Sequence, residues 1–154
     1  MDELDGRLLA LFTVEPRIGV LEASPRLGVA RGTGQARLDR LQAEEVVTGW
    51  GPDVSPAALG YPVTAFLTLE IRHGAGHDEV ATHLVSIPEA LEAHTITGAG
   101  DMWVRVVAAS NADLQRVIDL VLACPLIQRS TTVIALAEQV GFRTLPLVRA
   151  ATGT

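Results

Sequence analysis

The fold of the N-terminal half is decided by the stretch LGVARGTGQARLDRL, residues 27–41. A glycine, Gly28, ends an apolar segment, and residues with helical spacing, among them Leu38 and Leu41, come directly after it. Residues 26–40 hold four arginines and one acid in a chain whose formal net charge is −6. A glycine-marked turn before a locally positive helix is typical of a helix-turn-helix that reads DNA.

The composition limits the class of protein. The 154 residues suffice for one domain or two small ones, and 48% of them are hydrophobic, with a mean hydropathy of +0.30. No apolar run approaches the roughly 20 residues that span a bilayer, so we expect no membrane partner and a buried subunit interface instead. The acidic start lacks the basic region of a signal peptide, and one cysteine, Cys124, excludes an internal disulfide. Both features indicate the cytoplasm.

The N-terminal module is predicted to contain three helices. The first is capped by Asp2 or Asp5 and carries apolar residues at helical spacing: Leu4, Leu8, Leu11 and Phe12. The second covers 20–27 and ends at Gly28 in a left-handed cap, and the third covers 30–44.

The third helix is followed by a segment rich in valine and glycine. Residues 46–54 predict a short hairpin, or wing, after the helices. Residues 1–52 therefore read as a winged helix-turn-helix, and residues 53–62, which are rich in turn formers, read as a linker.

The second half alternates between strand and helix patterns. We expect strands over 63–71, 90–97, 102–108 and 127–136, and helices over 77–87 and from Ser110 to Pro125. This order is the ferredoxin-like βαββαβ plan, so the chain is α+β. The second domain covers 63–140, and 141–154 form a tail to which the pattern assigns no structure.

Two helices cover only one face of such a sheet. Phe66 lies on the opposite phase from Ala65 and Leu67, as expected when both faces are buried. The second face therefore needs a partner, and we expect the chain to dimerise through its sheet.

These parts, in this order, resemble the Lrp/AsnC (feast/famine) family of transcription regulators. The likeness covers about residues 4–139, including a linker like that of the family at 53–60. It is carried by the motifs Leu4-Asp5, Leu27-Gly28-Val29, Arg37-Leu38-Asp39-Arg40-Leu41, Gly98-Ala99-Gly100-Asp101 and Arg129-Ser130-Thr131-Thr132. The resemblance implies a homodimer, often assembled into octamers, that binds palindromic double-stranded DNA. It also implies a small effector, commonly an amino acid, near the Gly-x-x-Asp loop.

The candidates for DNA contact lie on the third helix and are Arg31, Thr33, Gln35, Arg37 and Arg40. Arginine offers paired donors to guanine or phosphate, and glutamine pairs with an adenine edge. The alternative is a solvated helix face with local pairs to Asp39 and Glu44.

The candidates for effector binding follow from the resemblance and are Thr97, Gly98, Gly100 and Asp101. Exposed backbone and one carboxylate suit the ammonium and carboxylate of an amino acid. Taken alone, the residues leave open that the glycines serve only a turn and that Asp101 bonds the backbone.

The remaining residues indicate no cofactor, no metal site and no catalytic pair. The histidines are dispersed, and His73 and His77 are separated by Gly74 and Gly76, which disfavour a helical pair of ligands. Residues 28–34 do not match the Gly-x-Gly-x-x-Gly nucleotide fingerprint. We therefore expect a protein that is not an enzyme.

Four residues of the N-terminal module depart from the family's pattern: Pro25, Ala30, Gly34 and Glu45. Glycine inside a helix costs ~1 kcal/mol, and the missing side chain of Gly34 would forfeit about 1.5–3 kcal/mol of burial. Pro25 removes a backbone donor, Ala30 lacks a capping hydroxyl, and Glu45 stands where glycine would ease the turn. We expect a weakened module in which Gly34→Val raises thermal stability and DNA affinity.

Two other functions stay open at this point. The chain could be an effector-binding or co-assembly protein with a weakened DNA-binding module. Siroheme decarboxylases also resemble this family and hold their substrate with histidine and arginine around a large pocket. The dispersed histidines make this enzyme the weaker alternative.

Overall fold

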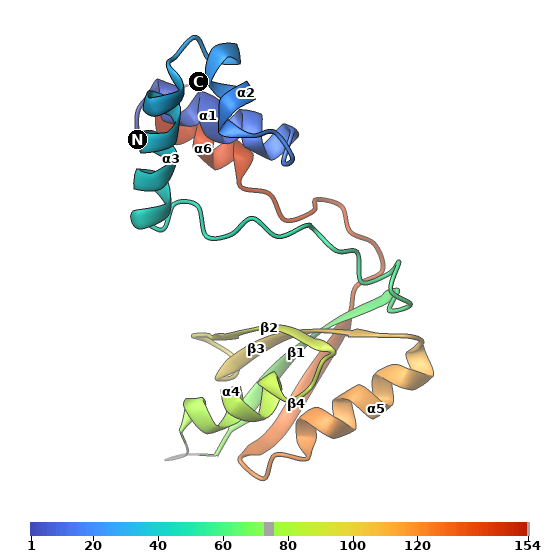
Figure 1. The fold of residues 1–154 in the computed structure, drawn as a ribbon. Coiled ribbons are helices and arrows are strands. Elements are labelled where there is room, and N and C mark those ends of the chain that lie inside the picture. The colour runs from blue at the N-terminus through green and yellow to red at the C-terminus, as the bar shows by residue number, and fades with distance from the viewer. Residues whose placement is uncertain (73–75, 154) are drawn as a thin grey trace. The chain divides into compact units, whose positions relative to one another are not determined.

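The structure of the protein is a computed structural model that describes residues 1–72 and 76–153. It divides into two compact units, one formed by Met1–Pro52 with Val140–Thr154 and the other by Asp53–Gln139 (Figure 1). Within the described residues, no helix combines the length and the apolar character needed to cross a membrane.

The first unit is helical and is built from α1 (Glu3–Val14), α2 (Val20–Arg26), α3 (Arg31–Ala43) and α6 (Leu145–Thr152). Asp2 caps α1 by accepting from the Asp5 amide at 2.9 Å, and the Asp5 carboxylate accepts from the Asp2 amide at 2.9 Å. Both aspartates suggested by the sequence therefore take part in one capping box.

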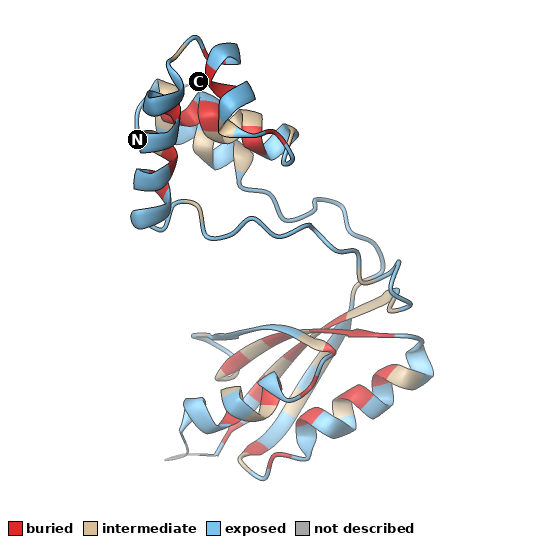
Figure 2. Cartoon of the chain, in the orientation of Figure 1, coloured by how far each residue is buried: buried red, intermediate tan, exposed pale blue. Residues whose placement is uncertain are grey.

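The helix-turn-helix core is formed by the first three helices and the segments that connect them. Its buried residues follow the apolar pattern of the sequence and are Leu8, Phe12, Ile18, Ala23, Leu27, Leu38 and Leu41 (Figure 2). The end of α2 is closed by Gly28, whose φ is 74°. Its amide and that of Val29 bond the carbonyls of Pro25 and Ser24, both at 3.0 Å, which is the glycine-terminated helix end predicted for this turn.

The C-terminal tail, to which the sequence pattern assigns no structure, forms part of this helical unit. α6 packs against α1, and the two helices approach closely at Gly6, which is buried. A Cβ atom on Gly6 would overlap the Thr152 hydroxyl and lie 2.8 Å from the Thr152 Cβ. Glycine is therefore the residue that lets α6 lie on α1.

The prediction of a hairpin over residues 46–54 is wrong, since these residues contain no strand. The amides of Val46 and Val47 both donate to the Leu41 carbonyl, at 2.9 and 3.1 Å. They are used to end α3 and are not available for a ladder between strands. Trp50 then packs edge-on against Phe12, with ring centroids 5.2 Å apart.

The second unit is a four-stranded antiparallel sheet with two helices. In chain order it consists of β1 (Val63–Ile71), α4 (His77–Val85), β2 (Ala90–Thr95), β3 (Met102–Ala108), α5 (Asn111–Leu122) and β4 (Ile127–Ile134). The strand order is β2-β3-β1-β4. The predicted ferredoxin-like α+β plan is confirmed.

The core of this unit lies between one sheet face and its helices, which lie on the same side of the sheet in Figure 1. Alternate residues of β1, Ala65, Leu67 and Leu69, are fully buried against apolar side chains of α4 and α5. The Ser110 hydroxyl accepts from the Asp113 amide at 3.0 Å and starts α5 where the sequence predicted. The period of two along β1 thus separates a helix-covered face from an open one.

The opposite sheet face carries a cluster of rings. Phe66 stacks on Trp103, with ring centroids 5.1 Å apart and ring planes 17° from parallel. The ring centroid of His94 lies 5.9 Å from that of Trp103. Val133, which pairs with Phe66 across the strands, is 60% exposed. The buried Arg105 Nε on β3 has no hydrogen-bond partner within the described residues. This face therefore combines exposed apolar area with an unsatisfied donor.

Candidate nucleic-acid interface and effector loop

Helices α2 and α3 contact each other at Gly34. The prediction that the missing side chain of Gly34 leaves an unfilled space there is wrong. A Cβ atom on Gly34 would overlap the hydroxyl oxygen of Ser24 and lie 3.5 Å from Cγ1 of Val20. The Ser24 hydroxyl donates to the Val20 carbonyl at 2.8 Å, so its position is held. The space that a larger residue would occupy on α3 is filled by the Ser24 side chain of α2.

The first three candidate DNA residues lie on the exposed side of α3. Arg31, Thr33 and Gln35 are all exposed, and Arg31 forms no ion pair with any described residue. The Gln35 amide donates to Asp39 Oδ1 at 2.7 Å, one of the local pairs that the sequence left as an alternative. Ala30 precedes the helix without a side-chain cap, as its sequence implied.

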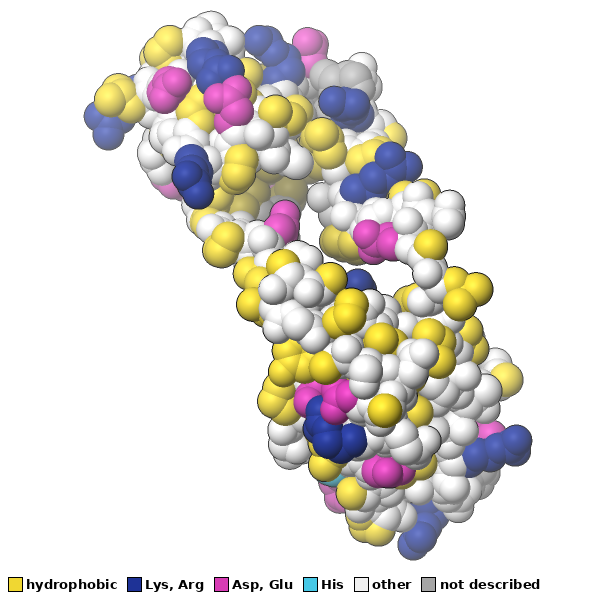
Figure 3. All heavy atoms as spheres, turned by 90° about the vertical axis from the view of Figure 1, so that its right-hand side faces the viewer, with side chains coloured by type: hydrophobic (Ala, Val, Ile, Leu, Met, Phe, Trp, Pro, Cys, Tyr) yellow, Lys and Arg dark blue, Asp and Glu magenta, His cyan; other side chains and the backbone are white. Residues whose placement is uncertain are grey.

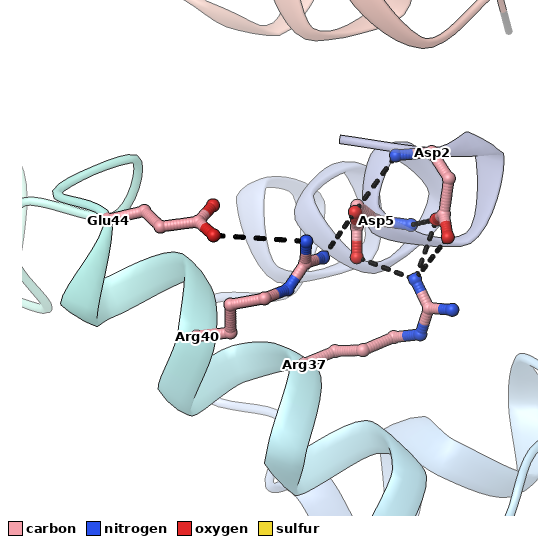
Figure 4. Close-up of polar contacts among 5 residues, drawn as sticks. All are labelled: Asp2, Asp5, Arg37, Arg40 and Glu44. Carbon is pink, nitrogen blue, oxygen red and sulfur yellow. Dashed lines mark hydrogen bonds and ion pairs between the residues drawn. The ribbon is translucent and has the colours of Figure 1, made fainter.

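The other two candidates, Arg37 and Arg40, point toward the N-terminus of α1 (Figure 4). Arg37 Nη1 lies 2.7 and 2.6 Å from the two oxygens of Asp2 and 2.8 Å from Asp5 Oδ1. Arg40 Nη2 donates to Asp5 Oδ2 at 2.6 Å, and its Nη1 is 4.0 Å from Glu44. Both arginines are therefore engaged within the unit.

The electrostatics of this cluster centre on Asp5, whose side chain is 0% exposed. Burial raises the pKa of the Asp5 carboxyl, but hydrogen bonds from Arg40, the Asp2 amide and Arg37 outweigh that effect and bring the pKa from 3.8 to about 2. The Arg37 guanidinium likewise lowers the pKa of Asp2. The two carboxylates are charged at neutral pH and balance the two guanidinium groups.

The positive charge that the sequence places at residues 26–40 is therefore largely cancelled in three dimensions. Arg26, at the end of α2, donates to Glu15 at 2.7 Å, so three of the four arginines pair with acids from or near α1. On the molecular face drawn in Figure 3, arginine side chains lie beside carboxylates in several places. A count of charges along the chain overestimates the local field because the neutralising acids are distant in sequence.

Beside the cluster α3 borders an open hollow of about 550 Å³. Its lining residues are Asp2, Gly32, Thr33, Ala36, Arg37 and Arg40. A Cβ atom on Gly32 would meet open space, in contrast to Gly34 two residues later. The small residues leave room for a ligand to approach the α3 backbone, with two arginines at its border.

The loop between β2 and β3 contains the candidate effector residues. Thr97 and Gly98 are exposed. Gly98 and Gly100 have φ angles of 109° and 111°, which side chains rarely adopt. A Cβ atom on Gly100 would overlap Thr68 Cγ2 and lie 3.2 Å from the Leu69 carbonyl oxygen. Both glycines are thus required by the turn itself.

Asp101 connects this loop to β1 through hydrogen bonds. Its amide donates to the Leu69 carbonyl at 2.8 Å, and its Oδ2 accepts from the Ile71 amide at 2.7 Å. The Ile96 amide donates to the Asp101 carbonyl at 3.0 Å. The backbone alternative left open by the sequence is therefore present, and Thr97 and Gly98 remain on the exposed side of the loop.

The histidines do not gather at a site in the described part of the chain. His83 Nε2 lies 2.8 Å from the Leu120 carbonyl, and His94 Nε2 lies 2.6 Å from Glu92. His73, which the sequence paired with His77 as a weak metal alternative, lies outside the described residues. Across residues 1–72 and 76–153, no three His, Cys, Asp or Glu side chains are grouped to hold a metal ion.

The sequence pattern indicates Asp2 and Asp5 only as helix caps, whereas in the structure both also pair with arginines of α3. A signal was present, because Asp5, Leu8 and Phe12 recur at the spacing of one helix face. A carboxylate on a face that is buried needs a cation. Arg37 and Arg40, three residues apart on another helix, offer two cations on one side.

Two family models match the chain. The model described as the AsnC-type helix-turn-helix domain matches residues 1–42, and the Lrp/AsnC ligand binding domain matches residues 64–144. Together they cover α2, α3 up to residue 42, and the sheet with its helices from residue 64 onward.

Individual proteins match over most of the length. The HTH-type transcriptional regulator FL11 of Pyrococcus furiosus is 29% identical over 136 residues, which cover 88% of this chain and 89% of that protein. Regulatory protein AsnC of Escherichia coli strain K12 is 28% identical over 141 residues, covering 91% of this chain and 93% of that protein.

Solved structures of other proteins are also similar to this chain over most of its length. Escherichia coli AsnC has a TM-score of 0.86 at 27% identity and covers 95% of this chain and 99% of its own. A transcriptional regulator from Neisseria meningitidis, solved as its L-Met complex, has a TM-score of 0.85 at 23% identity, covering 96% and 97% of the two chains. At that identity the second likeness concerns the fold.

Proposed function

Since the chain belongs to the Lrp/AsnC family of transcription regulators, we propose that it binds double-stranded DNA through α3 and responds to an amino-acid effector at residues 97–101. The observation that carries the DNA-binding part is the α2–Gly28–α3 pair, whose second helix exposes Arg31, Thr33 and Gln35. A helix in this position enters the major groove with the residues of its N-terminal part. Because its target is chromosomal DNA, we assign the protein to the cytoplasm.

The residues of α3 divide into two roles under this proposal. Arg31, Thr33 and Gln35 are exposed on its first turns and are suited to base edges and nearby phosphates. Arg37 and Arg40 are anchored to Asp5 and are suited to a fixed phosphate contact, which positions the helix without reading sequence.

Gel-shift titration of a duplex from the promoter of the protein's own gene tests this assignment. Arg31→Ala should weaken binding about 5- to 150-fold, since a good arginine contact contributes about 1–3 kcal/mol. Arg149→Ala, which removes an exposed arginine from α6 of the same unit, is the matched control and should change affinity little. Equal losses in both variants would refute the placement of α3 on DNA.

The effector proposal is supported by the exposed Thr97 and Gly98 and by the match to a ligand binding domain. L-Met in the Neisseria meningitidis regulator is a precedent from a protein of the same fold. Isothermal titration with each common amino acid tests it. Thr97→Val should lower the affinity for the amino acid that binds, whereas Thr95→Val, at the end of β2, serves as the control for a lost hydroxyl.

Self-association through the open sheet face is supported by the Phe66–Trp103 stack and by the exposed Val133. A partner sheet would cover this area and bring an acceptor to the Arg105 Nε. Val133→Asp should shift the protein toward monomer in analytical ultracentrifugation. Val85→Asp, an exposed valine on α4, should leave the sedimentation coefficient unchanged.

A second candidate, an effector-binding or co-assembly protein with weak DNA binding, is favoured by one observation. Three of the four arginines near α3 are paired with acids, which lowers the attraction for phosphates. The same titration separates the two functions. An intact oligomer that binds an amino acid but no promoter duplex would support this second candidate.

A further inference from the structure

The contact between Asp2 and Arg37 joins two groups with competing partners. Under the proposed function Arg37 belongs to the helix that contacts DNA, and its guanidinium binds phosphate oxygens there. In the free protein Arg37 Nη1 lies 2.7 and 2.6 Å from the two Asp2 oxygens. A carboxylate presents an anionic pair of oxygens much as a phosphate does. A phosphate approaching Arg37 therefore meets a competitor already in place.

The two aspartates of this cluster differ in how easily they can be displaced. Asp5 is 0% exposed and accepts from Arg37 at 2.8 Å, Arg40 at 2.6 Å and the Asp2 amide at 2.9 Å. Removing its partners would leave a buried charge unpaired, which is strongly unfavourable. Asp2 is 55% exposed, and its contact with Arg37 can be replaced by water, salt or another anion.

The hollow beside α3 gives an anion a path to this contact. Its lining includes Asp2, Arg37 and Arg40, together with the small residues Gly32, Thr33 and Ala36. A ligand backbone that follows α3 through the hollow therefore reaches the Asp2–Arg37 pair from the solvent side.

We propose that Asp2 is an autoinhibitory residue that occupies Arg37 in the free protein and gives way to a DNA phosphate. Asp5 keeps Arg37 and Arg40 in position in both states. The proposal rests on DNA binding by α3. Its consequence is a lower affinity for DNA of any sequence, because each encounter must first break an ion pair.

Asp2→Asn tests this directly. Asparagine caps a helix as well as aspartate does, so the variant removes the charge and retains the side-chain oxygen that accepts from the Asp5 amide. Glu3→Gln, one residue later in the exposed first turn of α1, is the matched control for net charge. Binding of a fluorescent random-sequence duplex is measured by anisotropy at low ionic strength.

We expect Asp2→Asn to bind about two- to fivefold more tightly than Glu3→Gln, the range that corresponds to a partly exposed ion pair. In an Arg37→Gln background the difference between the two variants should vanish, because Asp2 then has no guanidinium at residue 37 to pair with. Thermal unfolding checks that the unit is intact. If the asparagine cap proves unstable, Asp2→Ser supplies a second neutral cap.

The outcomes separate this proposal from the proposed function. Equal affinities of Asp2→Asn and Glu3→Gln, in a protein that binds the duplex, would overturn the autoinhibitory role and leave DNA binding in place. A difference that persists with Arg37→Gln would overturn it as well. Failure of the wild type and of every variant to bind the duplex would overturn both.

Discussion

A methyl group on Gly34 would overlap the hydroxyl oxygen of Ser24, so α3 packs against α2 without a vacancy. Gly34→Ala should therefore destabilise the protein by about 1–2 kcal/mol, although alanine favours the helix by ~1 kcal/mol. Gly34→Val should cost more, the reverse of the effect expected from the sequence. Thermal unfolding at fixed protein concentration measures both.

Ser24→Ala is the partner variant for this test. Without the hydroxyl, the nearest contact of an alanine at Gly34 is the Cβ of residue 24 at 3.4 Å, an ordinary packing distance. The double variant should regain the stability lost by Gly34→Ala. Gly32→Ala, in open space on the same helix, should raise stability by ~1 kcal/mol. A loss of stability at Gly32 equal to that at Gly34 would contradict the packing explanation.

Glu45, which follows the C-cap residue of α3, has a φ of 56°, a conformation that costs a side chain about 1–2 kcal/mol. Glu45→Gly should raise the free energy of unfolding by about 1 kcal/mol, because glycine adopts this region freely. Glu44→Gly is the control, since Glu44 has a φ of −85° and no strain to relieve. We expect that control to lower stability. Urea unfolding distinguishes the two.

The Asp5 cluster predicts a dependence of stability on acid. The pKa of Asp5 is lowered to about 2 in the folded chain, so its contribution is present above its ordinary value of 3.8 and is lost as the pH falls toward 2. The stability gap between wild type and Asp5→Asn should shrink by about 2 kcal/mol between pH 7 and pH 2. Urea titrations across this range measure the gap.

The contact between Gly6 and Thr152 predicts that α6 is needed by the first unit. Gly6→Ala would place a Cβ 2.8 Å from that of Thr152 and should release α6 from α1, lowering stability by about 1–3 kcal/mol. Combining it with Thr152→Ala should recover part of the loss, because two of the three crowded atoms are removed. Hydrogen exchange of α1 amides reports the release. Unchanged protection in Gly6→Ala would contradict the close packing.

The elements that could be predicted from sequence are those set by local chemistry. The Asp2 cap, the Gly28 helix end, the alternation along β1 and the Ser110 cap each depend on a few neighbouring residues. The structure has all of them where the pattern indicated.

The incorrect or missing predictions concern contacts between distant residues. Ser24 facing Gly34 could not be inferred from α3 alone, and so an empty space was expected where another helix supplies the side chain. The Asp5–Arg37 and Asp5–Arg40 pairs join residues 32 and 35 positions apart. Such pairings depend on the angle between helices, which apolar periodicity does not specify.

The position of α6 on α1 has a consequence for synthesis on the ribosome. Residues 3–14 emerge early, but the surface of α1 around Gly6 stays uncovered until residues 145–152 have been made. The sheet unit, whose residues are contiguous from 53 to 139, can fold in the interval. Formation of the helical unit is therefore delayed until residues 145–152 have been made, so nascent chains that stall before them would lack a finished DNA-reading unit.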